Sequence, residues 1–256
     1  MKFATYVINL EGSDARLAHI SAQLNAQGIP FQRVPAFDGR QLAIEQFPNF
    51  DAKAAYAFMG RPMRGGEVGC YLSHLKALRA FLDSDARYAV ILEDDAELAP
   101  GLAEVVGQII DWTRAEGVDF DVVNLGAEKL KYHRQLKDFG GWTLEHAFYF
   151  PMRATGMLWS RAGAEDFLHN YAQVDCPVDN QYRNWQSLVG RGLAVKPWVV
   201  LPSGAASDID AGRAARNIGE RSRFYGLIKQ RRIWGSKLQA LRTMRKPNLL
   251  APRPNF

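Results

Sequence analysis

Apolar runs and segments of helical periodicity alternate along the first forty residues. Residues 5–10 form a run rich in apolar and β-branched side chains, which predicts a strand. Leu17, Ile20 and Leu24 then recur at three- and four-residue steps, which predicts a helix, and residues 31–36 indicate a second strand. This order is typical of a βαβ unit, in which the two strands run parallel.

A second helix followed by a strand comes after residues 40–66, which we expect to form a short helical or irregular insertion. Apolar residues at helical spacing predict a helix over residues 67–82, and the short apolar run 88–92 predicts a buried strand. That strand ends abruptly in three acidic residues, Glu93, Asp94 and Asp95. In open α/β sheets, ligands bind where strands end in this way.

The rest of the chain continues the alternation, apart from the polar and mixed residues 128–146. Further strands are predicted at 120–125, 148–150, 156–159 and 193–201, and further helices at 102–112, 162–171 and 179–185. The pattern predicts an α/β fold with one main domain over residues 1–212. Residues 213–256 form a basic C-terminal tail, within which residues 221–246 have the pattern of an amphipathic helix.

The charge is unevenly distributed between these two parts. Residues 213–256 carry 12 Lys and Arg residues and one acidic residue, Glu220, so the tail has a net charge of +11 and residues 1–212 a net charge of −6. An acidic main domain argues against a nucleic-acid enzyme, whose working cleft should be basic. The tail suits contact with an anionic membrane surface, although a helix packed on the domain with a solvated basic face explains it too.

Two further features bear on location and redox chemistry. The first apolar run breaks at Asn9, too early for a signal peptide or a membrane span, which predicts a cytoplasmic protein. Cys70 and Cys176 lie far apart and show no metal-binding spacing, so we expect both to be buried apolar residues rather than a disulfide or zinc ligands.

The acidic cluster is the main candidate for chemistry. Three adjacent carboxylates at the end of an apolar strand need a positive partner, and Mg²⁺ or Mn²⁺ with oxygen ligands is a natural one. If strand alternation persists, Glu93 and Asp95 share one face and Asp94 points to the other. We therefore predict Asp95 and Glu93 as metal ligands, with a solvated acidic turn as the alternative.

Several blocks, in order and spacing, resemble glycosyltransferase family 25. They are Val7-Ile-Asn-Leu10 with Arg16, Ala36-Phe-Asp-Gly39, Gly66-Glu-Val-Gly-Cys-Tyr-Leu-Ser-His74, Ile91-Leu-Glu-Asp-Asp95, Thr155-Gly156, Ser160-Arg-Ala-Gly-Ala-Glu165 and Pro177-Val-Asp179. The resemblance implies a GT-A type fold with a Rossmann-like nucleotide-binding half. It also implies an inverting transfer of a hexose, usually galactose, from a UDP-sugar to a lipopolysaccharide-type, lipid-linked or other surface glycan. With an acceptor of this kind, we expect the protein to act at the cytoplasmic face of the inner membrane.

The resemblance and the predicted strand ends together suggest donor-binding residues. These are Asn9, Leu10, Arg16, Asp38 and Gly39 near the first two strands, Ser73, His74 and Lys76 near a helix start, and Glu93 and Asp94. Arg16 can bind phosphate in a bidentate manner, and a helix start can receive an anion. The plainer alternatives are an exposed helix charge for Arg16 and a common turn pair for Asp38 and Gly39.

An inverting transfer needs a base for the acceptor hydroxyl, and the candidate is Asp179, with Asp175 and Glu128 behind it. A helix N-cap is the alternative role for Asp179. Many GT-A enzymes add a late metal ligand, often His; this chain has no His after His169, so Asp208 or Asp210 would have to serve.

Two other classes of protein fit parts of the pattern. A nucleotidyltransferase also uses carboxylate-bound metal, but it should have a glycine-rich phosphate loop after its first strand, where this chain has only Gly12. A degenerate, membrane-associated carbohydrate-binding module would bind a glycan with no need for the acidic cluster.

Overall fold

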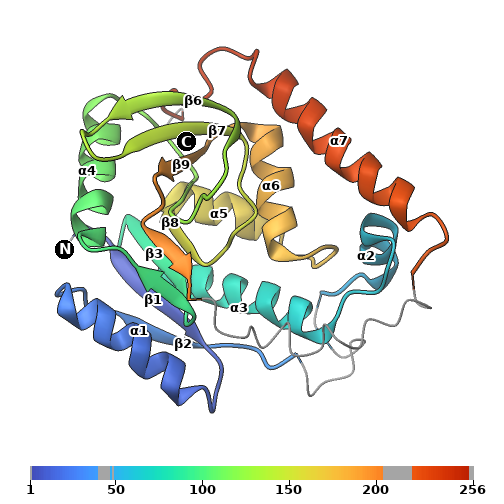
Figure 1. Cartoon of the computed structure of the whole chain (residues 1–256), viewed down its shortest axis with the longest axis horizontal. Coiled ribbons are helices and arrows are strands. Elements are labelled where there is room, and N and C mark those ends of the chain that lie inside the picture. The colour runs from blue at the N-terminus through green and yellow to red at the C-terminus, as the bar shows by residue number, and fades with distance from the viewer. Residues whose placement is uncertain (1, 40–46, 48, 204–220, 254–256) are drawn as a thin grey trace.

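An open mixed sheet forms the centre of the molecule. The computed structural model describes residues 2–39, 47, 49–203 and 221–253, and its large sheet has the strand order β2-β1-β3-β8-β5-β9-β7-β6 (Figure 1). The strands are β1 (Ala4–Asn9), β2 (Gln32–Pro35), β3 (Tyr88–Glu93), β5 (Val122–Asn124), β6 (Lys131–Asp138), β7 (Thr143–Tyr149), β8 (Gly156–Ser160) and β9 (Gly192–Lys196). A small second sheet pairs β4 (Ala96–Leu98) with β10 (Val200–Pro202).

The directions of the strands place the ends of β3 and β5 and the start of β8 at one edge of the sheet. β1, β2 and β3 are parallel, whereas β8 runs antiparallel to both β3 and β5. The carboxyl ends of β3 and β5 therefore lie beside the first residues of β8. The predicted βαβ opening and the α/β class are confirmed, and the parallel β1–β3 part agrees with the nucleotide-binding half that the resemblance implies.

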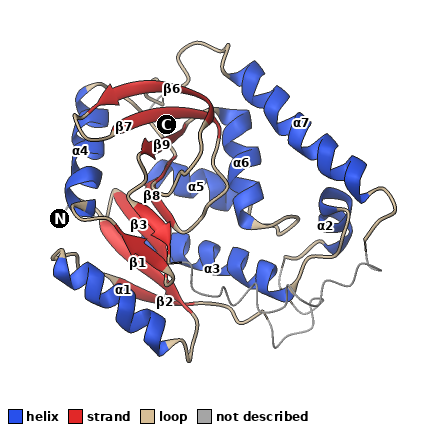
Figure 2. Ribbon diagram, in the orientation of Figure 1, coloured by secondary structure: helices blue, strands red, loops and turns tan. Residues whose placement is uncertain are grey.

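Helices cover both faces of the sheet. They are α1 (Asp14–Ala26), α2 (Ala52–Met59), α3 (Gly65–Leu82), α4 (Leu102–Ala115), α5 (Arg161–Asn170), α6 (Val178–Val189) and α7 (Tyr225–Thr243). Figure 2 shows α1 and α4 on one side and α3, α5 and α6 on the other. Alternate residues of the strands feed two separate cores: Ile8 and Ile91 pack towards α3, whereas Val7 and Val90 pack towards α1 and α4.

Two sequence expectations about strands are wrong. Residues 128–146 include most of the β6–β7 hairpin, whose β6 side chains are largely exposed and polar, so no apolar alternation indicates it. The strand expected over 193–201 ends at Lys196, because Pro197 has no N–H to continue the ladder, and resumes as β10 in the other sheet.

The basic helix predicted near the C-terminus is present as α7. It packs on α6, α2 and β7, so it is attached to the α/β body, while the boundary expected at residue 212 lies outside the described residues. After α7 the chain returns to the body, where Arg191 donates to the carbonyls of Leu249 and Ala251 and Arg253 pairs with Asp119 and Asp121. Within the described ranges, no helix has the length and hydrophobicity needed to cross a bilayer.

Candidate functional site

A pocket lies where β1 and β3 end, between α1 and α3. It encloses about 670 Å³, open solvent included. The predicted residues that line it are Leu10, Arg16, Asp38, Gly39, Ser73, His74, Glu93, Asp94 and Asp95. Asn9, Lys76 and Asp179 do not line it. A second hollow shares Arg16, Asp94 and Asp95 with this pocket and extends past His19 to Ser203.

Asp94 points towards β1 and α1. The Asn9 side-chain amide donates to Asp94 Oδ2 at 2.7 Å, and Arg16 Nη1 lies 3.6 Å from Asp94 Oδ1. Asn9 is only 1% exposed, and its own oxygen accepts from Arg33 Nε at 2.8 Å. Asn9 therefore orients Asp94 from below the pocket, which differs from the direct donor contact expected of it.

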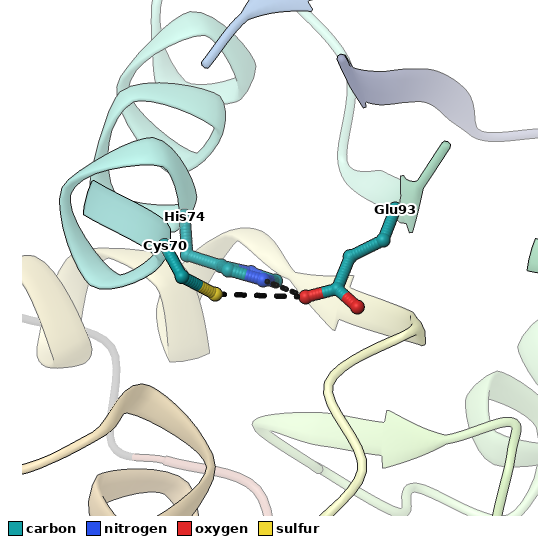
Figure 3. A group of neighbouring side chains, drawn as sticks. All are labelled: Cys70, His74 and Glu93. Atoms are coloured by element: carbon teal, nitrogen blue, oxygen red, sulfur yellow. Dashed lines mark hydrogen bonds and ion pairs between the residues drawn. The ribbon is translucent and has the colours of Figure 1, made fainter. Parts of the chain in front are cut away.

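Glu93 points the other way, towards α3, as strand alternation predicts. His74 Nε2 lies 3.1 Å from Glu93 Oε1, and Cys70 Sγ donates to the same oxygen at 3.7 Å (Figure 3). The Thr155 side chain adds a further hydrogen bond. Burial raises the pKa of Glu93, but these bonds, that from His74 foremost, outweigh it and leave the pKa below its usual value. Glu93 is therefore an ionised carboxylate held in place by three side chains.

Cys70 corrects one expectation. It is partly exposed in the pocket wall, whereas Cys176 is buried as expected. Cys70 and His74 lie one turn apart on α3, and with Glu93 they place three potential ligand atoms within 4.8 Å of one another. Burial, followed by the charge of Glu93, raises the pKa of the Cys70 thiol, which keeps it protonated as a donor. The i, i+4 spacing of Cys70 and His74, which puts both on one face of a helix, is the sequence feature that could have indicated this cluster, although we did not predict it from the sequence.

Asp95 has a buried carboxylate oxygen, Oδ1, with no hydrogen-bond partner among the described residues. Burial, and then the negative charges of Glu93 and Asp94, raise its pKa to about 7. A buried oxygen without a donor beside two more carboxylates suits a cation with hard oxygen ligands, so the residues fit Mg²⁺ or Mn²⁺. Asp95 and Glu93 would hold such an ion, with Asp94 beside them.

Ser73 and Lys76 connect the loop after β2 to α3. Ser73 Oγ accepts from Phe37 N at 2.9 Å, and Lys76 Nζ donates to the Pro35 carbonyl at 2.9 Å and lies over the Phe37 ring. The helix begins at Gly65, so Ser73, His74 and Lys76 lie in its interior. The expectation that these three residues lie at a helix start is wrong, so the free N–H groups of a helix start cannot serve them there. Ser73 and His74 line the pocket, and Lys76 holds the loop after β2.

Three glycines allow that loop to touch α3. A Cβ on Gly39 would overlap the Gly65 carbonyl, and a Cβ on Gly69 would lie 2.7 Å from the Phe37 carbonyl oxygen. Both approaches are closer than real Cβ atoms allow, so glycine is required where the backbones of the loop and of α3 meet. The contact places Asp38 and Gly39 at the pocket rim.

Asp179 lies in the first turn of α6, whose N-cap is Pro177, so the alternative N-cap role is wrong. Its Oδ1 accepts from the backbone and side-chain nitrogens of Asn180, and burial raises its pKa to about 6. Asp179 is near enough to Cys70 to influence its pKa through charge. Asp179 therefore lies near Cys70 although it does not line the pocket, and its role as the base stays a prediction.

The remaining candidate carboxylates lie outside the pocket lining or outside the described residues. Burial raises the pKa of Asp175. Glu128 pairs with Arg153 at 2.8 Å on the surface. Asp208 and Asp210 lie outside the described residues.

The arrangement has two chemical capacities. Asp95 and Glu93 offer oxygen ligands to a divalent cation, and Arg16 on α1, beside Asp94, offers a guanidinium to an anionic group. A diphosphate with a bound metal ion needs both, and the strand edge supplies a crevice for the attached nucleoside.

Comparisons with known proteins identify the family of this chain. Residues 3–182 match the family described as glycosyltransferase family 25 (LPS biosynthesis protein). A glycosyltransferase 25 family member of Aedes aegypti is 30% identical over 167 residues, which cover 64% of this chain and 27% of that protein. Procollagen galactosyltransferase 1 of Danio rerio is 23% identical over 154 residues, 54% of this chain and 26% of that protein.

A probable inactive glycosyltransferase 25 family member 3 of Bos taurus is 26% identical over 129 residues, 49% of this chain and 22% of that protein. The chain thus spans about a quarter of the length of these curated relatives. The family match itself covers well over half of this chain and includes the α3 and β3 segments that form the pocket. The chain belongs to glycosyltransferase family 25.

Proposed function

We propose that this chain is an inverting, metal-dependent hexosyltransferase that moves galactose from UDP-galactose to a lipopolysaccharide-type or other surface glycan. The observation that carries the proposal is the buried Asp95 oxygen, which has no hydrogen-bond partner among the described residues. Asp95 lines, together with Glu93 and Arg16, a pocket at the carboxyl edge of parallel strands. That set of groups suits a nucleoside diphosphate with a metal ion. The names of relatives that are galactosyltransferases support the choice of sugar.

The residues that line the pocket have distinct proposed roles. A bound Mg²⁺ or Mn²⁺ would neutralise charge that develops on the diphosphate. Arg16 contributes a fixed positive charge to the same group, and Asp38 at the rim accepts hydrogen bonds from the nucleoside. His74, Cys70 and Thr155 hold Glu93 in one orientation, so that no reorganisation is needed when the donor binds.

Asp179 is the proposed base. The acceptor hydroxyl oxygen forms a bond to the anomeric carbon while the bond from that carbon to the diphosphate oxygen breaks, and UDP leaves with the electron pair. The hydroxyl proton passes to the Asp179 carboxylate. The acceptor must approach between the pocket and α6, because Asp179 stands at the start of that helix.

The first test is calorimetric binding of UDP-galactose, UDP-glucose and UDP-N-acetylglucosamine, with and without Mn²⁺. We expect Mn²⁺-dependent binding, tightest for UDP-galactose, and a loss of at least tenfold in Asp95→Asn. Asp111→Asn on α4 is the matched control, because Asp111 is an exposed carboxylate paired only with Lys2 among the described residues. Binding that does not depend on Mn²⁺ and is unchanged in Asp95→Asn would refute the role of Asp95 as a metal ligand.

A turnover assay separates an enzyme from a binding module. UDP release in the presence of a lipooligosaccharide acceptor, with product analysed by mass spectrometry, should show a mass gain of one hexose. Donor binding with no UDP release and no mass gain for any surface glycan would favour the binding module over the transferase.

A further inference from the structure

The outward face of α7 carries an apolar strip. Phe224, Leu227, Trp234 and Leu238 are between 50% and 70% exposed, and they are half of the large hydrophobic residues found exposed in the described chain. Their spacing of three, seven and four residues puts them on one side of the helix. Isolated exposed apolar residues are ordinary, but four on one helix face form a patch that suits a partner.

Basic residues flank this strip. Residues 221–253 contain ten Lys and Arg residues and no acidic residue; Arg232 and Arg253 contact the body, whereas Arg223, Lys229 and Arg231 are exposed. The Arg223 guanidinium lies 4.7 Å from the Phe224 ring centre, and Lys237 Nζ lies 4.6 Å from the Trp234 ring centre. Cations and apolar side chains are therefore presented together, on the same surface.

The opposite face of α7 is attached to the body. Ser236 donates to the Asn184 side chain, and Thr243 donates to the Ser187 carbonyl on α6. Arg232 contacts α2 through the Phe58 carbonyl and the Phe58 ring. Figure 1 shows α7 along the outer rim of the molecule, against α2 and α6. These contacts fix which side of α7 faces outward.

We propose that the outward face of α7 binds the surface of an anionic phospholipid bilayer. Leu227, Trp234 and Leu238 would enter the boundary between headgroups and acyl chains, where Trp side chains are favoured, while the Lys and Arg residues contact the phosphates. A second copy of the chain is disfavoured because two faces of the same positive charge would meet. An acidic nucleic acid would leave the apolar strip in water.

The test is co-sedimentation of the purified chain with vesicles of phosphatidylcholine alone and of 70:30 phosphatidylcholine and phosphatidylglycerol. We expect binding to the anionic vesicles that weakens as salt rises. The variant Leu227→Ser/Trp234→Ser/Leu238→Ser should lose it. Replacing Arg231 and Lys237, on and beside the strip, with Gln should lower the partition coefficient about fivefold for each charge removed.

Trp198→Ser is the matched control, since Trp198 is 40% exposed and lies outside α7. It should bind vesicles like the wild type. Circular dichroism checks that the variants stay folded. Absence of binding to anionic vesicles, or equal binding by the triple variant, overturns the proposal, as does a dimer in light scattering that the triple variant abolishes. The assay needs no sugar donor, so its failure leaves the proposed transfer untouched.

Discussion

The contact between the Phe37–Gly39 loop and α3 allows a test of the packing, because Gly69 leaves room for the loop and is not needed for the geometry of the helix. In Gly69→Ala the new Cβ would lie 2.7 Å from the Phe37 carbonyl oxygen and 2.9 Å from Gly39 N. Real Cβ atoms do not come so close to backbone, so the loop must move. Overpacking of this kind costs about 1–3 kcal/mol.

The same substitution has an opposing benefit, since Ala in a helix interior is favoured over Gly by about 1 kcal/mol. Gly107→Ala on α4 isolates that benefit, because a Cβ at Gly107 has nothing within 4 Å. In urea unfolding we expect Gly107→Ala to be stabilised by about 1 kcal/mol. Gly69→Ala should be about 1–3 kcal/mol less stable than Gly107→Ala.

Displacement of the loop should also be measurable in binding, because Phe37, Asp38 and Gly39 all line the pocket. UDP affinity, measured by calorimetry, should fall in Gly69→Ala and stay unchanged in Gly107→Ala. Equal stability of the two variants, with equal UDP affinity, would refute the packing argument.

Three further perturbations follow from contacts described above. If Asp179 is the base, it must be ionised, and burial raises its pKa to about 6. We therefore expect kcat/KM to fall as the pH drops through about 6. A pH profile without this fall excludes Asp179 as the base. Arg253→Ala removes a partner of the buried Asp121 and should lower the unfolding free energy by about 1–2 kcal/mol, whereas Lys2→Ala at an exposed pair should change it little. Ser160→Ala removes the cap of α5 and a bond to the Phe120 carbonyl; urea unfolding should register a loss of about 1–2 kcal/mol, and an unchanged midpoint would contradict the capping role.

Local patterns predicted the parts of the fold that depend on local chemistry. The apolar run of β3 and its acidic end were visible in the sequence, and two-residue alternation correctly put Asp94 and Glu93 on opposite faces, where they meet α1 and α3. The cap of α5 is equally local: Ser160 accepts from the N–H of Gly163, three residues on, and a serine just before a helical pattern is the sequence signal for it.

Contacts made across the chain were the ones that the sequence did not reveal. The polar β6 is a strand only because it pairs with β7, which in turn pairs with the distant β9. The cluster around Glu93 needs Cys70 and His74 from another element, and its geometry depends on how α3 packs on the sheet. The position of Asp179 outside the pocket lining was likewise set by tertiary packing.

The reversal of β8 has a consequence for how this site tolerates change. At the pocket edge β3 ends, whereas β8 begins. Thr155, the residue just before β8, therefore contacts Glu93 at the end of the loop that leads into β8. Residues inserted after Asp95 would displace β4, which begins at Ala96 and pairs with β10. Residues inserted just before Thr155 would push directly on the side chain that helps to hold Glu93. Loop-length variation should therefore be resisted on both sides of this junction.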